Sequence, residues 1–240
     1  MGITFDFRNK TVLVSGATQG IGLAIAMAFA HAGACVHITG TREDADCYDA
    51  DLRRFTYHRC QMESAADREA LSEAIPALDV LVNNAGMTRP DEYETAGFAA
   101  LIEVNLVALA DMCFRFRDRL EATRGAIINL GSVSSHIAVR DHPAYTASKH
   151  AVTGLTKALA DKWARRGIRV NSVAPGFIET RIIDWARSAP EDRSRFVQQV
   201  PAGRFGEPDD VAKLVLFLAS PEADYVRGAS IPIDGGYLLR

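Results

Sequence analysis

The stretch TVLVSGATQGIG at residues 11–22 decides the fold that we expect for this chain. Its first four residues form an apolar run typical of a buried strand, and the glycine-rich turn leads into a helical pattern with one apolar face. Glycine allows unusual backbone angles and a close approach of the main chain to a pyrophosphate, which free N–H groups at the helix start can bind. The order strand, turn, helix therefore predicts a nucleotide-binding unit.

The glycines of this turn have the spacing Gly-x-x-x-Gly-x-Gly, not the Gly-x-Gly-x-x-Gly of the commoner dinucleotide fingerprint. A glycine cluster alone is often only a tight turn, but this one follows a strand and opens a helix, as dinucleotide binding requires. We predict cofactor contacts from Gly16, Thr18, Gln19, Gly20, Ile21 and Gly22.

The alternation of apolar run and amphipathic helix continues along the chain. Further strands are expected at residues 35–39, 55–60, 79–83, 126–130, 168–174 and 230–233, and helical segments near 98–123, 145–149 and 209–219. Continuous apolar strands are typical of a parallel sheet covered by helices on both faces. Because no linker, repeat or low-complexity tract divides residues 1–240, we expect an α/β fold: a single doubly wound, Rossmann-type domain.

Composition argues against several classes of protein. Of the 240 residues, 48% are hydrophobic and 24% charged, and the net charge of −3 leaves no basic footprint for nucleic acid. No basic stretch followed by an apolar segment opens the chain, and no apolar run reaches the roughly 18 residues of a membrane span. We therefore expect a cytoplasmic protein without a membrane or nucleic-acid partner.

The four cysteines, Cys35, Cys47, Cys60 and Cys113, show neither CxxC pairing nor histidines at zinc spacing. Cys35 and Cys60 fall in apolar, strand-like runs, where cysteine is usually a small buried hydrophobe. We expect no disulfide framework and no metal site.

Tyr145 and Lys149 stand four residues apart in the run AYTASK (144–149), which places them on one face of a helix. A phenol has a pKa of roughly 10, too high for easy proton transfer at neutral pH. An ammonium beside it favours the phenolate and lowers that pKa toward the working range. The pair alone is weak evidence, because many solvated helix faces carry one by chance.

Together with the glycine turn, this pair makes the chain resemble the short-chain dehydrogenase/reductase family over nearly all of its length. The family's further motifs follow in order: Asn83-Asn84-Ala85-Gly86, Asn105, Ser132, Pro175-Gly176, Thr180, Arg204–Pro208 and Asp234-Gly235-Gly236. Each is weak by itself, but jointly, in order and spacing, they are specific. The resemblance implies a seven-stranded parallel sheet.

The resemblance also implies the catalytic roles. Tyr145 would be the general acid in carbonyl reduction and the base in alcohol oxidation. Lys149 would lower the pKa of Tyr145 and bind the nicotinamide ribose. Ser132 would donate to the substrate oxygen as negative charge develops there. Asn105 would hold a water that links Lys149 to solvent.

The family resemblance also implies which residues contact the cofactor and how subunits assemble. Cofactor contacts are implied for Asn83, Ala85, Gly86, Tyr145, Lys149, Pro175, Gly176, Ile178 and Thr180. In the family, the helices that carry Asn105 and Tyr145 often form a subunit interface. The resemblance therefore implies a homotetramer, with a homodimer as the alternative.

The end of the second strand bears on the choice of cofactor. NAD-preferring relatives usually carry an acidic residue there for the ribose 2′-OH, but this chain has Gly40, followed by Thr41 and Arg42. This arrangement favours NADP(H), with Thr41 and Arg42 near the 2′-phosphate. NAD(H) stays possible, because Gln19 stands where many NADP-dependent relatives have Arg or Lys, and carboxylates follow at positions 43, 44 and 46.

Two segments near the expected substrate pocket are less informative. His142 precedes Pro143 at a helix start, where capping is an adequate explanation. By family analogy, residues 180–205 form a lid over the substrate. Its arginines, Arg181, Arg187, Arg193 and Arg195, could bind an anionic substrate, but a charge-rich lid is more often solvated.

Together these features predict an NAD(P)-dependent oxidoreductase that interconverts a secondary alcohol and a ketone. The substrate could be a 3-oxoacyl thioester, a sugar or polyol, or another small hydroxy compound. A non-catalytic dinucleotide-binding regulator is the alternative, although it would have no need of Asn105, Ser132, Tyr145 and Lys149. An epimerase or dehydratase of the extended relatives would normally need a longer C-terminal substrate domain.

Overall fold

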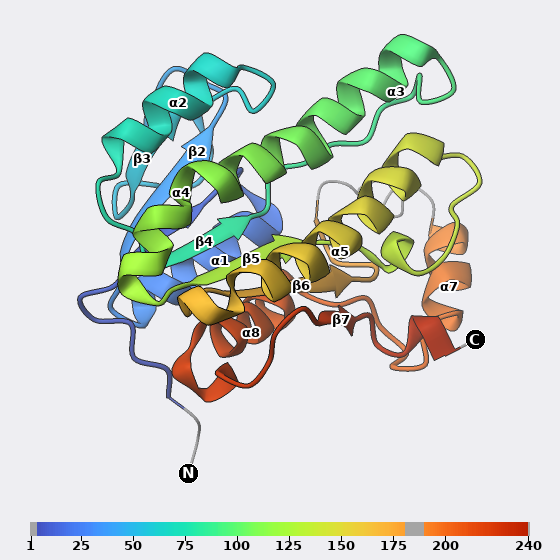
Figure 1. Cartoon of the computed structure of the whole chain (residues 1–240). Coiled ribbons are helices and arrows are strands. Elements are labelled where there is room, and N and C mark those ends of the chain that lie inside the picture. Colours follow the sequence, from blue (N-terminus) through green and yellow to red (C-terminus); the bar gives the residue numbers. More distant parts are fainter. Residues whose placement is uncertain (1–3, 181–189, 240) are drawn as a thin grey trace.

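The computed structural model describes residues 4–180 and 190–239. Within these residues, seven strands form one parallel sheet in the order β3-β2-β1-β4-β5-β6-β7 (Figure 1). The strands are β1 (Thr11–Val14), β2 (Cys35–Gly40), β3 (Thr56–Arg59), β4 (Val80–Asn83), β5 (Ala126–Leu130), β6 (Arg169–Pro175) and β7 (Ser230–Ile233). The α/β fold and the seven parallel strands predicted from the sequence are confirmed.

Helices connect most of these strands. They are α1 (Gly20–His31), α2 (Ala65–Ala74), α3 (Thr95–Ile102), α4 (Leu109–Thr123), α5 (Pro143–Trp163), α7 (Pro190–Gln198) and α8 (Pro208–Ala219), with a π-helical segment, η2 (Glu103–Ala108), between α3 and α4. The described residues also form short 3-10 turns: η1 (Ala45–Cys47), η3 (Val133–Ser135), η4 (Ala164–Arg166), η6 (Pro221–Ala223) and η7 (Tyr237–Leu239). Between β2 and β3 the chain forms only the 3-10 turn η1, where the other connections between β1 and β6 contain an α-helix.

The continuous apolar strands supply two separate cores, because successive side chains point to opposite faces of the sheet. Val12 and Val14 of β1 pack in one buried cluster with α1 and α8. Leu13, between them, packs in a second cluster with α2, α4 and α5. Figure 1 shows helices on both sides of the sheet, as these two clusters require.

The sheet reverses its direction of growth between β1 and β4. From β1 the chain builds outward to β2 and β3, and from β4 it builds the other way to β7. Because the strands are parallel, the carboxyl ends of β1 and β4, at Val14 and Asn83, lie side by side. The loops that follow these two strands diverge from this point. Such a switch point is where open α/β sheets bind their ligands.

The segments α3, η2 and α4 form one continuous helix, Thr95–Thr123, which starts a few residues before the expected Phe98. By length and composition alone, this helix could cross a membrane. That is weak evidence, since 44% of its apolar window is buried within the protein, and a core helix of a soluble protein passes the same test. Met112 and Phe116 are fully buried in the cluster that contains Leu13 of β1, and Leu101 is fully buried as well.

The cysteines differ from one another in burial. Cys60 is buried as predicted, but Cys35 is exposed, and the prediction of a buried side chain there is wrong. Cys35 opens β2, whose burial begins only with Val36. Among the described residues, no cluster of three or more His, Cys, Asp or Glu side chains could hold a metal ion.

Candidate active site

The glycine turn after β1 has the backbone that its sequence predicts. Gly16 and Gly20 have φ angles of +63° and +56°, in the left-handed region that favours glycine. A Cβ on Gly22 would lie 2.5 Å from Asn84 Nδ2 and from the carbonyl oxygen of Gly16, so only glycine allows this close approach. The main-chain N–H of Gly16 donates to Thr39 Oγ1 at 2.9 Å, which fixes the turn against β2.

Helix α1 begins at this turn without a side-chain cap. Gln19 is its N-cap residue, and the Gln19 side chain accepts no hydrogen bond from the N–H groups of the first turn. The first turn of α1 also lacks acidic side chains among its described residues. Its N–H groups and positive dipole end are therefore available to an anion such as a phosphate.

The loop after β4 is fastened to the glycine turn by Asn84. Asn84 Nδ2 donates to the carbonyl oxygens of Ser15 and Gly16, each at 2.9 Å. The main-chain N–H groups of Asn84 and Ala85 both donate to Ser15 Oγ at 3.0 Å. Asn84 belongs to the same motif as the predicted cofactor residues Asn83, Ala85 and Gly86, but it was not itself predicted as a site residue.

Asn83 itself faces into the protein. Its Nδ2 donates to Asn129 Oδ1 at 3.0 Å and to Cys113 Sγ at 3.2 Å, and the residue is 3% exposed. Only the main chain of Asn83 could therefore contact a cofactor. Gly86, by contrast, lies at the site, because a Cβ there would be 3.3 Å from Asn105 Oδ1 and 3.8 Å from Lys149 Nζ.

Asn105 is buried within the π-helical segment, a rare conformation that is frequent at functional sites. Its side-chain amide pairs with the main chain of Met87: Nδ2 donates to the Met87 oxygen at 2.9 Å, and the Met87 N–H donates to Oδ1 at 2.8 Å. The side chain thus fastens the loop after β4 to the π-helical segment η2. A water between Lys149 and solvent stays a prediction.

Ser132 and Tyr145 meet at the end of β5. Ser132 is buried and begins the turn η3, where its Oγ accepts a hydrogen bond from the Ser134 N–H at 3.1 Å. Its hydroxyl also forms a hydrogen bond with the side chain of Tyr145 on helix α5. Ser135 Oγ donates to the Lys149 carbonyl oxygen at 2.8 Å, which fastens η3 to the same helix.

Lys149 lies one turn along α5 from Tyr145, with Nζ 5.5 Å from the centre of the phenol ring. Its ammonium donates to the Leu130 carbonyl oxygen at 2.8 Å, and the residue is 5% exposed. Burial lowers the pKa of Lys149 from 10.5 to about 8. The structure therefore groups Ser132, Tyr145 and Lys149, with Asn105 nearby at Gly86.

The pKa of Tyr145 runs against the expectation. Burial of the phenol raises it above 10.0; the hydrogen bond with Ser132 lowers it in part, and the nearby charge of Glu92 raises it again. The ammonium of Lys149 is not among the groups that shift it, and its described hydrogen bond is to Leu130. The lowering of the Tyr145 pKa by Lys149 therefore stays a prediction.

Side chains crowd the end of β2. A Cβ at Gly40 would lie 2.5 Å from Tyr48 Oη and 2.6 Å from Thr18 Cγ2, so a side chain there would require these two side chains to move. Thr41 and Arg42 follow and are exposed. The guanidinium of Arg42 stacks over the Tyr48 ring, 4.8 Å from its centre, and donates to the Cys47 carbonyl oxygen.

The segment after β6 reaches the glycine turn. Pro175 ends the strand beside Ile233, and Gly176 packs against Asp234, 2.9 Å from where a Cβ would stand. Thr180 lies next to Gly20, with Cγ2 3.4 Å from a Cβ added there. The other predicted cofactor residues of this segment and of α1, Ile178 and Ile21, pack against the apolar core.

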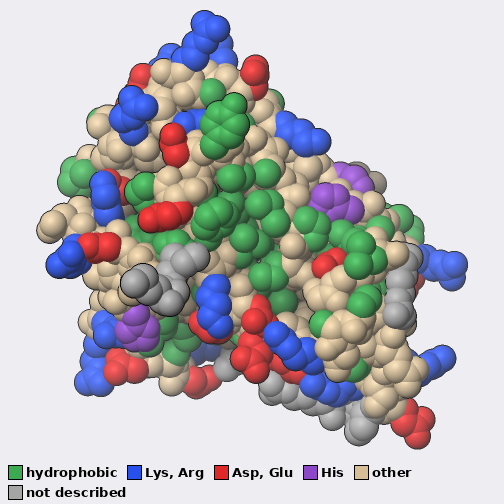
Figure 2. Space-filling model, turned by 90° about the horizontal axis from the view of Figure 1, so that it is seen from below, with side chains coloured by type: hydrophobic (Ala, Val, Ile, Leu, Met, Phe, Trp, Pro, Cys, Tyr) green, Lys and Arg blue, Asp and Glu red, His purple; other side chains and the backbone are tan. Residues whose placement is uncertain are grey.

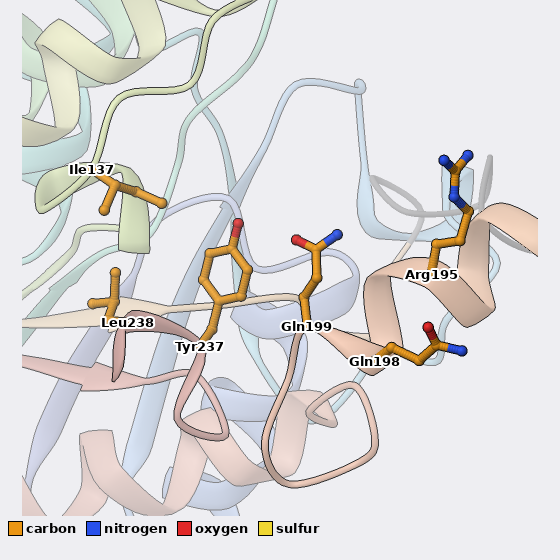
Figure 3. Close-up of a pocket in the computed structure, with 6 residues that line it drawn as sticks. All are labelled: Ile137, Arg195, Gln198, Gln199, Tyr237 and Leu238. Atoms are coloured by element: carbon orange, nitrogen blue, oxygen red, sulfur yellow. The ribbon is translucent and has the colours of Figure 1, made fainter. Parts of the chain in front are cut away.

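A cavity of about 530 Å³ lies between helix α7, the segment after η3 and the C-terminal turn. It is lined by Ile137, Arg195, Gln198, Gln199, Tyr237 and Leu238. Figure 3 shows Ile137 and Leu238 facing one another, with the Tyr237 hydroxyl and the Gln199 amide pointing the same way, while Arg195 and Gln198 lie on α7.

Of the arginines predicted in the lid, Arg193 pairs with Glu179, and Arg195 lines this cavity. Arg181 and Arg187 lie outside the described residues. His142, expected as a cap, forms no side-chain cap at the start of α5. Its Nδ1 lies 3.0 Å from Glu92 Oε1 instead, because a buried carboxylate from another segment faces it.

Fold and site together define a dinucleotide-binding protein of the Rossmann type with a Ser–Tyr–Lys centre. The chain belongs to the short-chain dehydrogenase/reductase family. A family model described as enoyl-(acyl carrier protein) reductase matches residues 16–238.

Relatives with different names cover almost the whole chain. It is 37% identical to 2-dehydro-3-deoxy-D-gluconate 5-dehydrogenase of Bacillus subtilis, over 98% of this chain and 97% of that protein. It is 36% identical to 3-oxoacyl-(acyl-carrier-protein) reductase of Vibrio cholerae, over 98% and 99%. A crystal structure of a candidate 2-deoxy-D-gluconate 3-dehydrogenase from Agrobacterium tumefaciens, with bound NADP, is 35% identical, covers 100% of both chains and has a TM-score of 0.89.

Proposed function

We propose that this protein is an NAD(P)-dependent oxidoreductase that interconverts a secondary alcohol and a ketone, with Tyr145 as general acid and base. The observation that carries this proposal is the grouping of Ser132, Tyr145 and Lys149 next to Gly86. That grouping lies at the edge of the sheet where the glycine turn also stands.

The residues of the chain fit a dinucleotide cofactor, which supplies or accepts the hydride when bound. Gly16 and Gly22 keep the turn free of side chains, and the uncapped start of α1 can take the phosphates. Ala85 and Gly86 border the turn on one side, and Thr180 borders it on the other. The main chain of Asn83 holds Ala85 and Gly86 in place. Pro175, Gly176 and Ile178 hold Thr180 in place.

Side chains of the protein donate and accept the proton. In reduction, Tyr145 gives its phenolic proton to the substrate oxygen, and Ser132 donates a hydrogen bond to the same oxygen as it becomes negative. Lys149 supplies positive charge beside the resulting phenolate. Asn105 is proposed to hold the water through which the proton is replaced.

The end of β2 favours NADP(H) over NAD(H). Gly40 stands where an acidic residue would bind the 2′-OH, and the exposed guanidinium of Arg42 can face a 2′-phosphate beside Thr41. The NADP bound to the similar Agrobacterium protein supports this choice. Turnover with NADH and NADPH at equal low concentrations tests it, and a clear preference for NADH would overturn it.

The cavity beside α7 is the proposed substrate pocket, and residues 180–205 the proposed lid. Amide, hydroxyl and guanidinium groups line it next to Ile137 and Leu238. Such a lining suits a small, polyhydroxylated alcohol better than a long acyl chain. The names of relatives include sugar-acid and 3-oxoacyl enzymes, so a panel of polyols, sugar acids and 3-oxoacyl thioesters, read by NAD(P)H absorbance, tests function and substrate class together.

We also propose a homotetramer, with a homodimer as the alternative, because two separate apolar surfaces are exposed. Val107 and Phe114, 44% and 53% exposed, lie on the long helix beside a groove that Leu155 of α5 also lines. Figure 2 shows hydrophobic side chains gathered in the middle of a second face, with charged groups around them, on the side where α8 and the edge strand β7 lie in Figure 1. Two interfaces suit a tetramer, and one suits a dimer. Light scattering after gel filtration distinguishes them.

We further propose that residues 1–240 act as one domain in the cytoplasm, without membrane or nucleic acid. The packing of Leu101 and Phe116 of the long helix in the core and the net charge of −3 support this. Cell fractionation tests it: activity in the membrane pellet would contradict the proposal.

A further inference from the structure

A buried carboxylate faces the start of the helix that carries Tyr145. Glu92 lies in the connection between β4 and α3, and its side chain is 0% exposed. Glu92 Oε2 accepts a hydrogen bond from the main-chain N–H of Tyr145 at 2.9 Å. Glu92 Oε1 lies 3.0 Å from His142 Nδ1 and accepts from the Arg89 N–H at 3.3 Å.

The start of α5 explains why a carboxylate is stable in this buried place. Helix α5 has Pro143, which lacks an N–H, in its first position and no side-chain cap from His142. The N–H of Tyr145 therefore needs a partner from elsewhere, and the positive end of the helix favours a negative one. Burial raises the pKa of Glu92, but the hydrogen bonds from Tyr145 and His142 outweigh it, so its pKa is lowered overall. Glu92 is thus ionised at neutral pH.

A second contact joins the same two segments. Tyr93 Oη donates to the carbonyl oxygen of Arg140 at 2.6 Å. Residues 89–93 therefore hold the loop before α5 at two neighbouring points, through Glu92 and Tyr93. The loop runs directly into the first turn of the helix, where the phenol of Tyr145 is attached.

We propose that Glu92 is a positioning residue for the reaction: it caps α5 from the β4–α3 connection and sets the placement of the Tyr145 phenol. The inference rests on the proposed role of Tyr145. The titratable groups that contact the Glu92 carboxylate are His142 and, through its main chain, Tyr145; Arg89 contributes its N–H, while its guanidinium pairs with Asp91. The negative charge of Glu92 is one of the causes that raise the pKa of the Tyr145 phenol, and a neutral residue at position 92 removes it.

The test compares Glu92→Gln with Glu94→Gln. Glutamine keeps the size of Glu92 and one oxygen for the Tyr145 N–H, so the fold is retained while the charge is lost. Glu94, two residues along the same segment, is exposed and caps nothing with its side chain in the described structure, so its variant makes the same charge change without the contact. Glu92→Ala removes the cap itself.

For Glu92→Gln we expect kcat to fall about 3- to 10-fold with the KM for NADPH unchanged, and the pKa of Tyr145 in the pH profile of kcat/KM to move down. Glu92→Ala lowers kcat about 10- to 100-fold. Glu94→Gln matches the wild type in all three measurements. A purely structural role would change stability without moving the pH profile.

Tyr145→Phe, assayed in parallel, separates the possible failures. If Tyr145→Phe is inactive and Glu92→Gln has the rate and pH profile of Glu94→Gln, the positioning role is overturned and the proposed function stands. If Tyr145→Phe keeps its turnover, both are overturned. If Glu92→Ala does not fold, the comparison of the two glutamine variants still decides.

Discussion

The ammonium of Lys149 lies over the ring of Tyr145, with Nζ 5.5 Å from the ring centre. Burial favours the neutral form of both groups. It raises the pKa of Tyr145 and lowers the pKa of Lys149 to about 8. A buried ammonium beside a phenol gains an oppositely charged neighbour when the phenol becomes a phenolate, which favours loss of the phenolic proton. The proposed chemistry depends on this relationship.

Lys149→Met is expected to abolish turnover without weakening the fold. A pKa lowered from 10.5 to about 8 means that burying the charged ammonium costs about 3 kcal/mol. Losing the bond to the Leu130 oxygen costs about 1–3 kcal/mol in return. Urea unfolding at pH 7 should therefore show a stability equal to or above the wild type, with turnover down at least about 100-fold. A loss of stability of about 3 kcal/mol would contradict this account of the burial cost.

Gly22→Ala is expected to disrupt cofactor binding more than Tyr145→Phe does. Its Cβ would lie 2.5 Å from Asn84 Nδ2 and from the Gly16 oxygen, so the turn must open and the β4 loop must move. We expect the Kd for NADPH to rise at least about 10-fold and the protein to lose about 1–3 kcal/mol of stability. Isothermal titration calorimetry and urea unfolding measure the two effects. Unchanged affinity would show that phosphates do not bind at this turn.

Arg42→Ala is expected to reduce the preference for NADPH. A charge-assisted hydrogen bond to a phosphate contributes about 1.5–3 kcal/mol, so the KM for NADPH should rise about 10- to 100-fold while that for NADH stays constant. Arg53→Ala is the matched control, because Arg53 is 82% exposed in the same connection and pairs with Asp51. Equal effects of the two variants, or of Arg42→Ala on both cofactors, would contradict a role in binding the 2′-phosphate.

The pair His37 and His58 is expected to make the protein less stable in acid. The rings stack between β2 and β3, with Nδ1 of His37 2.9 Å from Nε2 of His58, and burial lowers the pKa of both below 6.5. Because the unfolded chain binds these protons more readily, stability is full above pH 6.5 and falls as the pH drops below it. Urea unfolding between pH 7.5 and 5.5 should show this slope, and His58→Gln should flatten it. The same slope in the variant would assign the acid sensitivity to other groups.

The sequence predicted the elements whose signals are local. The glycine turn and the strand Ser230–Ile233 follow from spacing and apolar runs alone, and the structure confirms them. The grouping of Ser132, Tyr145 and Lys149 was also predicted, because family motifs preserve their order along the chain.

What the sequence did not predict depends on distant packing. Glu92 meets Tyr145 across 53 positions, and no local pattern distinguishes it from its exposed neighbour Glu94. Cys35 lies in an apolar run but is exposed, since burial in β2 begins one residue later. The raised pKa of Tyr145 likewise follows from desolvation, which spacing along a helix does not report.

Tyr145→Phe tests the central claim most directly, because it removes one oxygen and leaves the packing of the ring in place. The measurement is kcat with the best substrate of the panel, together with the Kd for NADPH by fluorescence titration. We predict a fall in kcat of at least about 100-fold with the Kd within about twofold of the wild type. Turnover close to that of the wild type would contradict the assignment of Tyr145 as the proton donor.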